Sequence, residues 1–247
     1  TGLPSSLFSV SGLEFYGAIN CLKGGIIFSD AVSTVSPTYA REILTAEYGC
    51  GLEGVLASRR DGVIGVTNGI DEAAWDPAHD AYLPAKYHAN DLSGKQTCKR
   101  ALQQELGLPI LDVPLVAVIG RLTFQKGFDL LLEILPELMA LDLQLVVLGT
   151  GDAHLEQGFI AAKERYARRI GLHLGFDEGL AHRIEAGSDM LIMPSRYEPC
   201  GLSQLYSLRY GTVPIVRRTG GLADTVVPFR PSTIKSKIAT GFHFIDP

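Results

Sequence analysis

The sequence predicts an α/β fold in which a parallel sheet carries helices on each side. From Val113 onward, short apolar runs alternate with longer stretches whose apolar residues recur at helical spacing. The apolar runs are almost uninterrupted by polar residues, which is typical of strands buried on both faces. Right-handed crossovers make neighbouring strands of this kind parallel, so both observations indicate the same fold class.

Strands and helices are expected to alternate in this part of the chain. The strands are the short apolar runs, at residues 115–119, 143–148, 170–174, 189–193, 213–216 and 241–245. The helices have the longer amphipathic pattern, at residues 95–106, 128–141, 153–168, 178–186 and 202–210. Gly107 follows the first of these helices and is expected to end it, because glycine is preferred just past a helix C-terminus.

The first part of the chain has a different pattern, with glycine-rich turns and two apolar segments. Ser36 followed by Pro37 fits the N-cap and first-turn preferences of a helix, and residues 38–48 continue with helix-compatible side chains. A turn is expected at Asn68-Gly69. The weaker pattern over residues 71–112 indicates a connecting segment with one helix near its end.

The charge balance gives no sign of a polyanionic partner. The formal net charge is -5 and the pI is near 5.7, so the chain has no overall attraction for nucleic acid or anionic lipid. The densest basic spots are isolated arginine pairs, shorter than the runs of interaction tails. No apolar segment reaches the roughly 20 residues of a membrane helix. We therefore predict neither a nucleic-acid nor a membrane partner.

The cysteines lie far apart in the sequence, at positions 21, 50, 98 and 200. They form no CxxC pair and have no Cys/His spacing suited to a zinc site. They are therefore expected to be reduced thiols, with the cytoplasm as the default location.

The stretch from Pro194 to Leu202 has the strongest character of a binding turn. It falls where a buried strand is expected to become a helix, and ligands of open α/β sheets gather at that edge. Glu198 is flanked by Arg196, and helix-start amides are available from Gly201 onward, which suits a polar ligand. An ordinary strand-to-helix loop explains the same residues about equally well.

Three other stretches fall at predicted strand ends. Residues 120–127 carry two cations, Arg121 and Lys126, at a spacing that suits a diphosphate, although a solvated loop is an equal alternative. Residues 149–151 resemble the start of a dinucleotide fingerprint, but His154 replaces its third glycine, so an NAD site is not expected. Thr219-Gly220-Gly221 suits an anion or a plain tight turn.

Motifs of other chemistries are absent from the sequence, including the P-loop, the nucleophile elbow and the zinc-protease helix. Asp-x-Asp, which holds a divalent metal in one class of sugar-nucleotide enzymes, is also absent. A leaving phosphate would then be stabilised by Arg121 and Lys126, and we predict neither a metal nor a cofactor.

Several motifs together resemble the bacterial glycogen synthase family, which includes bacterial-type starch synthases. They lie at residues 12–15, 36–40, 68–71, 120–127, 198–202 and 218–225, in the family's order. The resemblance implies a GT-B glycosyltransferase with two Rossmann-like domains. It implies transfer of glucose from ADP-glucose to the non-reducing end of an α-1,4-glucan, with retained anomeric configuration and without a metal.

The resemblance also implies roles for individual residues. Arg121 and Lys126 would bind the donor diphosphate and stabilise the departing ADP. Glu198 would contact the transferred glucose without acting as a covalent nucleophile. Phe176 would lie against the adenine, with a core phenylalanine as the equal alternative. The remaining expected site residues are Cys200, Gly201, Leu202, Ser203, Gly220 and Gly221 on the donor side and Asn68 in the acceptor cleft.

The resemblance further implies a fragment, because the family's N-terminal Lys-x-Gly-Gly loop and active-site histidine lie upstream of this chain. Residues 1–66 are expected to be the tail of the acceptor-side domain, and residues 67–247 most of the donor-binding domain. The fragment is expected to have little or no transferase activity. Two alternatives stay open: a non-catalytic nucleotide-sugar or glucan-binding module, and a related GT-B enzyme that uses UDP-glucose. The sequence does not predict an oligomeric state.

Overall fold

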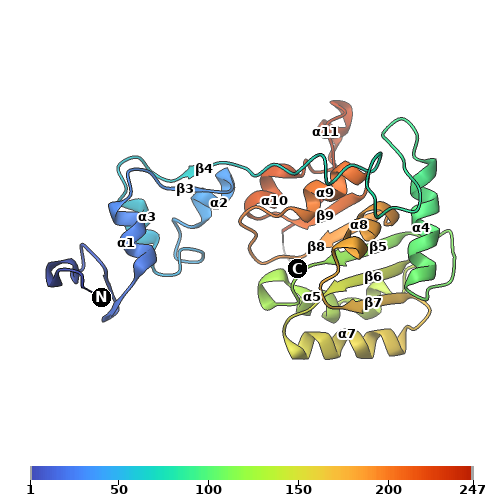
Figure 1. Ribbon diagram of the computed structural model, residues 1–247, viewed down its shortest axis with the longest axis horizontal. Coiled ribbons are helices and arrows are strands. Elements are labelled where there is room, and N and C mark those ends of the chain that lie inside the picture. The colour runs from blue at the N-terminus through green and yellow to red at the C-terminus, as the bar shows by residue number, and fades with distance from the viewer. Residues whose placement is uncertain (1, 246–247) are drawn as a thin grey trace. The chain divides into compact units, whose positions relative to one another are not determined.

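The computed structural model describes residues 2–245 of the chain, which forms two compact units (Figure 1). The first unit runs to Asn68 and the second begins at Gly69. Each unit has its own core, so each is described by itself. The assignment of these parts to an acceptor side and a donor side stays a prediction.

The first unit consists of short elements around a small core. They are η1 (Ser5–Leu7), β1 (Glu14–Phe15), β2 (Ala18–Ile19), α1 (Cys21–Phe28), β3 (Ser33–Thr34), α2 (Pro37–Glu42), α3 (Glu53–Ala57) and β4 (Ile64–Gly65). Strands β1 and β2 form an antiparallel hairpin, whereas β3 and β4 pair in parallel. Ile26 of α1 packs against Leu52 and Leu56 at α3, and these side chains form the buried centre of the unit.

Helix α2 begins where the sequence predicts. Ser36 is its N-cap and accepts a hydrogen bond from the amide three residues on, at 2.9 Å, while Pro37 occupies the first turn. The helix ends at Glu42, earlier than the helix-compatible residues 38–48 suggest. The Thr45 amide bonds the Glu42 carbonyl only three residues back, at 2.9 Å, so turns replace the α-helical pattern there.

The second unit contains a parallel sheet, as predicted. Its strands are β5 (Leu115–Ile119), β6 (Gln144–Gly149), β7 (Ile170–Leu174), β8 (Met190–Met193), β9 (Val213–Arg217) and β10 (Phe242–Phe244). The spatial order is β10-β9-β8-β5-β6-β7, and every pair of neighbours is parallel. The chain reverses its direction of travel across the sheet at β5, and in open α/β sheets ligands bind at the carboxyl ends of the strands beside such a point.

Helices cover both faces of this sheet (Figure 1). They are α4 (Ser93–Glu105), α5 (Phe128–Glu133), α6 (Leu135–Leu138), α7 (Ala153–Arg165), α8 (Glu178–Gly187), α9 (Ser203–Tyr210), α10 (Gly220–Thr225) and α11 (Pro231–Lys235), with the 3-10 helix η2 (Phe124–Lys126). Val116 and Val118 share one core with residues of α5 and α7. Leu115 and Ala117 share the other with residues of α4 and α8, as the two-residue period of a strand requires.

Residues 128–141 form two short helices instead of the single helix that the pattern predicts. Helix α5 ends at Glu133, and α6 starts at Leu135 with Pro136 in its first turn. Pro136 has no amide to bond the Leu132 carbonyl four residues back, and its ring clashes with that carbonyl in a continuous helix, so the helix is interrupted at Ile134.

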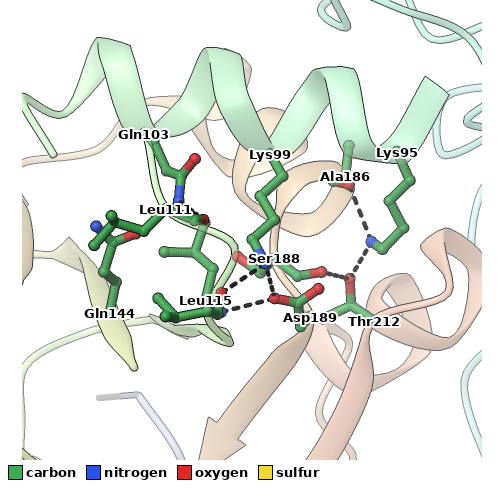
Figure 2. Close-up of polar contacts among 11 residues, drawn as sticks. Lys95, Lys99, Gln103, Leu111, Leu115, Gln144, Ala186, Ser188, Asp189 and Thr212 are labelled. Carbon is green, nitrogen blue, oxygen red and sulfur yellow. Dashed lines mark hydrogen bonds and ion pairs between the residues drawn. The ribbon is translucent and has the colours of Figure 1, made fainter. Parts of the chain in front are cut away.

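Helix α4 is attached to the amino end of the sheet by polar side chains at four-residue spacing. Lys95, Lys99 and Gln103 lie on one face of the helix and point toward the strand starts (Figure 2). Each is buried, and each donates at least two hydrogen bonds. The acceptors include Leu111, Val113, Gln144, Ala186, Asp189 and Thr212. This end of the sheet is therefore occupied by structural contacts.

Glu185 of α8 is a buried carboxyl group in the same region. It accepts a hydrogen bond from the Ser207 hydroxyl at 2.6 Å. Burial raises the pKa of Glu185 from 4.5 to about 8, whereas burial lowers the pKa of neighbouring Lys95 from 10.5 to about 8. The folded state therefore holds the Glu185 proton more tightly than the unfolded chain does.

We predict that the free energy of unfolding falls as the pH rises, because the buried Glu185 carboxyl group favours its protonated form in the folded state. Its contribution is full below about pH 4.5 and is lost toward pH 8, with a slope of up to about 1.4 kcal/mol per pH unit. Urea unfolding at half-unit pH steps should show this slope in the unaltered chain and a clearly smaller one in Glu185→Gln. Ser207→Ala should keep the slope and extend it to higher pH, because it removes a donor to the ionised carboxylate. Equal slopes in the unaltered chain and Glu185→Gln would contradict the assignment.

Candidate functional site

Three turns lie together at the carboxyl end of the parallel sheet. They are residues 120–127 after β5, residues 194–202 after β8 and residues 218–221 after β9. Because β5, β8 and β9 are neighbours in the sheet, their carboxyl ends share one edge. The structure thus brings together the stretches that the sequence singles out, at the edge where ligands of such sheets bind.

Lys126 and Glu198 form an ion pair within this group of turns. The Lys126 Nζ lies 2.5 Å from Oε2 of Glu198, and the Ser195 hydroxyl donates to the same oxygen at 3.0 Å. The Glu198 side chain is only 7% exposed, whereas that of Lys126 is 21% exposed. A buried carboxylate needs such partners, and the remaining exposure of Lys126 leaves its charge within reach of a ligand.

Backbone contacts hold the three turns against one another. A Cβ atom on Gly127 would lie 2.1 Å from the Pro194 carbonyl oxygen, and one on Gly221 would lie 2.2 Å from that of Cys200. The Gly221 amide also donates to the Glu198 carbonyl at 3.0 Å. The Gly221 amide is therefore engaged within the protein, so this residue would serve a donor site by holding the Glu198 turn in place.

Gln204, which the sequence did not single out, holds the turn that contains Cys200. The Gln204 Nε2 donates to the carbonyls of Cys200 and Gly201, each at 3.0 Å. Gly201 has a φ of +75°, which favours glycine, and helix α9 starts at Ser203 just beyond the half-exposed Leu202. The Leu205 and Tyr206 amides both bond the Leu202 carbonyl, at 2.9 and 3.0 Å, so the Ser203 and Gln204 amides are the ones that the helix leaves without an acceptor of its own.

A cavity of about 270 Å³ opens at the carboxyl ends of β5, β6 and β7. It is lined by the last residues of β5 and β6, by Ala181 of α8 and by the segments that follow the three strands, which contribute Gly120, Arg121, Thr150, Gly175, Phe176 and Asp177. Arg121 is exposed, and its guanidinium has no hydrogen-bond or ion-pair partner among the described residues. The Phe176 side chain is 89% exposed, so it is not a core residue and offers a bare aromatic ring beside the cavity.

A larger hollow, of about 510 Å³, lies on an apolar part of the sheet. It is lined by Ile192, Ile215 and Phe244 together with residues of α5. Its lining includes the carboxylate of Glu133 and no cation, so it does not suit a phosphate group despite its size.

The structure shows the surroundings of three further residues that the sequence analysis names. The Arg196 guanidinium, two residues before Glu198, is paired with Asp129 at 2.7 Å. Gly220, with a φ of +43°, is buried at the start of α10. Asn68 is exposed at the end of the first unit, and its assignment to an acceptor cleft stays a prediction.

Within residues 2–245, no group of three or more His, Cys, Asp or Glu side chains is placed to hold a metal ion. No helix in the described part of the chain has both the length and the apolar character needed to cross a bilayer. All four cysteines are free thiols.

Sequence families match both parts of the chain. Residues 1–58 match the starch synthase catalytic domain family, and residues 103–244 match the family of glycosyl transferases group 1. The chain therefore belongs to the group 1 glycosyl transferases, a family of transferases.

Its relatives within that family are glycogen synthases. The glycogen synthase of Anaeromyxobacter sp. (strain Fw109-5) is 56% identical over 246 residues, which cover 99% of this chain and 51% of that protein. The glycogen synthase of Thioalkalivibrio sulfidiphilus is 53% identical over 98% of this chain and 50% of its own length. The predicted resemblance is confirmed, and the chain spans about half the length of the relatives it matches.

Solved structures support the fold assignment. The catalytic domain of starch synthase IV from Arabidopsis thaliana, bound to ADP and acarbose, matches with a TM-score of 0.92 and 40% identity, over 99% of this chain and 51% of that one. Anabaena HepE in complex with UDP and glucose matches with a TM-score of 0.59 at 16% identity, over 90% of this chain and 51% of that one. The second likeness concerns the fold alone. The predicted Rossmann-like, GT-B-type fold is confirmed.

We predict that Gly127→Ala disrupts the contact between the first two turns. Gly127 has a φ of +70° and touches the Pro194 carbonyl, whereas Gly211 has a φ of +69° with open space around its Cα. Gly211→Ala should therefore cost only the left-handed backbone penalty of about 1–2 kcal/mol. Gly127→Ala should lower the free energy of unfolding by clearly more, measured by urea denaturation. Equal losses in the two variants would show that the close approach has no energetic role.

Proposed function

We propose that this chain carries the donor-binding part of a retaining glucosyltransferase site of the glycogen and starch synthase type. The reaction of the complete site is the transfer of glucose from ADP-glucose to the non-reducing end of an α-1,4-glucan. The observation that carries the proposal is the position of Arg121 and Lys126 on one turn, with Arg121 unpaired beside a cavity and Lys126 paired with buried Glu198. The glycogen synthase relatives support the same assignment.

The two cations would stabilise the leaving group. When the bond between glucose and the diphosphate breaks, negative charge builds up on the departing phosphate oxygens. Lys126 is held by Glu198, whose carboxylate is itself held by the Ser195 hydroxyl, so the ammonium group needs little reorganisation to meet that charge. Arg121 can bind two phosphate oxygens at once, since its planar guanidinium has no competing partner among the described residues.

Glu198 would orient the transferred glucose rather than attack it. Retaining hydrolases place two carboxyl groups about 5–5.5 Å apart, one of them as nucleophile. The hydrogen-bond partners of the Glu198 carboxylate in this structure are an ammonium group and a hydroxyl group. We therefore assign two roles to Glu198. Its carboxylate would bind hydroxyl groups of the transferred glucose, and its ion pair would hold the Lys126 charge near the diphosphate. Amides at the start of α9, around Cys200, Gly201 and Ser203, would supply further donors.

The nucleoside would occupy the cavity of about 270 Å³ with Phe176 against its base. An ADP-type donor is supported by the starch synthase structure, which is bound to ADP. A uridine donor is the alternative within the same fold, since HepE is in complex with UDP. The α-1,4-glucan acceptor, a role for Asn68 and a cytoplasmic location belong to the same proposal, and the four free thiols suit a reducing compartment.

We predict that the chain binds ADP more tightly than UDP, as calorimetric titration can measure. Arg121→Ala and Lys126→Ala should each weaken ADP binding about 10- to 100-fold, because each removes a charged hydrogen bond to phosphate. Arg168→Ala is the matched control: Arg168 is also exposed and has no partner among the described residues, but it precedes β7 at the opposite end of the sheet.

Three results would count against this proposal. Absence of ADP binding would contradict the proposed donor site. Tighter binding of UDP than of ADP would show that the donor base is uracil and not adenine. Equal losses in Arg121→Ala and Arg168→Ala would show that the effect is a general one of positive charge. Glucose incorporation into glycogen, measured in parallel, separates a catalytic chain from a binding module.

A further inference from the structure

We propose that Arg196 and Asp129 are positioning residues that clamp the turn carrying Lys126 against the turn carrying Glu198. The proposal rests on the proposed donor site, because the clamp would set where the Lys126 charge meets the diphosphate. Arg196 lies two residues before Glu198, and Asp129 lies three residues after Lys126. The clamp therefore joins the same two turns as the ion pair of the site.

The Arg196 guanidinium makes a two-point contact with Asp129. Its Nη1 lies 2.7 Å from Oδ1 of Asp129, and its Nη2 lies 2.8 Å from Oδ2. The same Nη1 donates to the Phe124 carbonyl at 2.7 Å, and the guanidinium lies 3.6 Å from the centre of the Phe124 ring. One side chain from the Glu198 turn thus reaches both the start of η2 and the start of α5.

The backbones of the two turns are also joined beside this side chain. The Arg196 amide donates to the Gln125 carbonyl at 2.8 Å. The Arg196 carbonyl in turn accepts from Nη1 of Arg217, the last residue of β9, at 2.6 Å. The backbone of Arg196 is therefore bonded both to the Arg217 side chain of β9 and to the backbone of η2.

Lys126 lies in η2, between the buried residues Leu122 and Phe128. Helix η2 has three residues, none of them buried, and the Phe124 side chain is 63% exposed. A segment without core residues depends on its polar contacts for its position. Those contacts come from the Glu198 turn, chiefly from Arg196, so the position of Lys126 depends on a residue that touches neither Lys126 nor Glu198.

The clamp differs from an ordinary surface ion pair. Isolated exposed pairs contribute little, but two-point arginine–carboxylate contacts within a network fix orientation as well as distance. Arg196 and Asp129 are 24% and 34% exposed, and Arg196 lowers the pKa of the Asp129 carboxyl. Lysine at position 196 could reach one oxygen but could not bind both and the Phe124 carbonyl at once.

The chain offers a matched control in Arg183 and Glu105, which join α8 to α4. This pair is also a two-point contact, made through Nε and Nη2 at 2.8 and 2.7 Å, and its exposed fractions are similar at 25% and 38%. It has no contact with η2 or the Glu198 turn. Arg183→Ala should therefore show the effect of losing a comparable ion pair while it leaves the candidate site unchanged.

The test combines amide hydrogen exchange with nucleotide titration on the 247-residue chain. In Arg196→Ala, Arg196→Lys and Asp129→Asn, exchange in residues 124–127 should become at least about tenfold faster. ADP binding should weaken at least about tenfold, and AMP binding by less than about threefold, because AMP lacks the second phosphate. Arg183→Ala should change none of these values.

A double variant separates positioning from general damage. If Arg196 acts through Lys126, ADP binding by Arg196→Ala/Lys126→Ala should be no weaker than by Lys126→Ala alone. Additive losses, equal losses of AMP and ADP binding, or unchanged exchange in residues 124–127 would each overturn the clamp. If the unaltered chain binds no ADP, the proposed function fails together with the diphosphate role of the clamp, whereas the exchange data still decide whether Arg196 fixes η2.

Discussion

The ion pair between Lys126 and Glu198 is the contact on which the candidate site depends. It joins the turns after β5 and β8, two neighbouring strands whose connecting segments are far apart in the sequence. The same pair keeps a buried carboxylate compensated and leaves a lysine charge partly exposed at the strand ends. This one interaction therefore contributes both to the stability of the turns and to their readiness for an anionic ligand.

The two ends of the sheet have different roles. At the amino end, Lys95, Lys99 and Gln103 fill the space between α4 and the strand starts with internal hydrogen bonds (Figure 2). At the carboxyl end, glycines replace side chains, and backbones approach one another closely at Gly127 and Gly221. The rigid end holds the strands, so the turns at the open end have fixed starting points from which to present charge to a ligand.

The sequence predicts the sheet well because buried parallel strands are almost purely apolar, and it predicts Lys126 and Glu198 through motif and family resemblance. It does not reveal contacts between distant elements: Arg196 is noted as a neighbour of Glu198, but its partner Asp129 lies on another element and no local pattern indicates the pair. Local chemistry was overlooked at Pro136, which divides the predicted helix over residues 128–141.

The most direct test of the account is a crystal structure of this chain grown with ADP. The account predicts the adenine against Phe176 and the phosphates within hydrogen-bond distance of both Arg121 and Lys126, with Lys126 still near Glu198. Density for ADP elsewhere, or phosphates that meet neither cation, would contradict it.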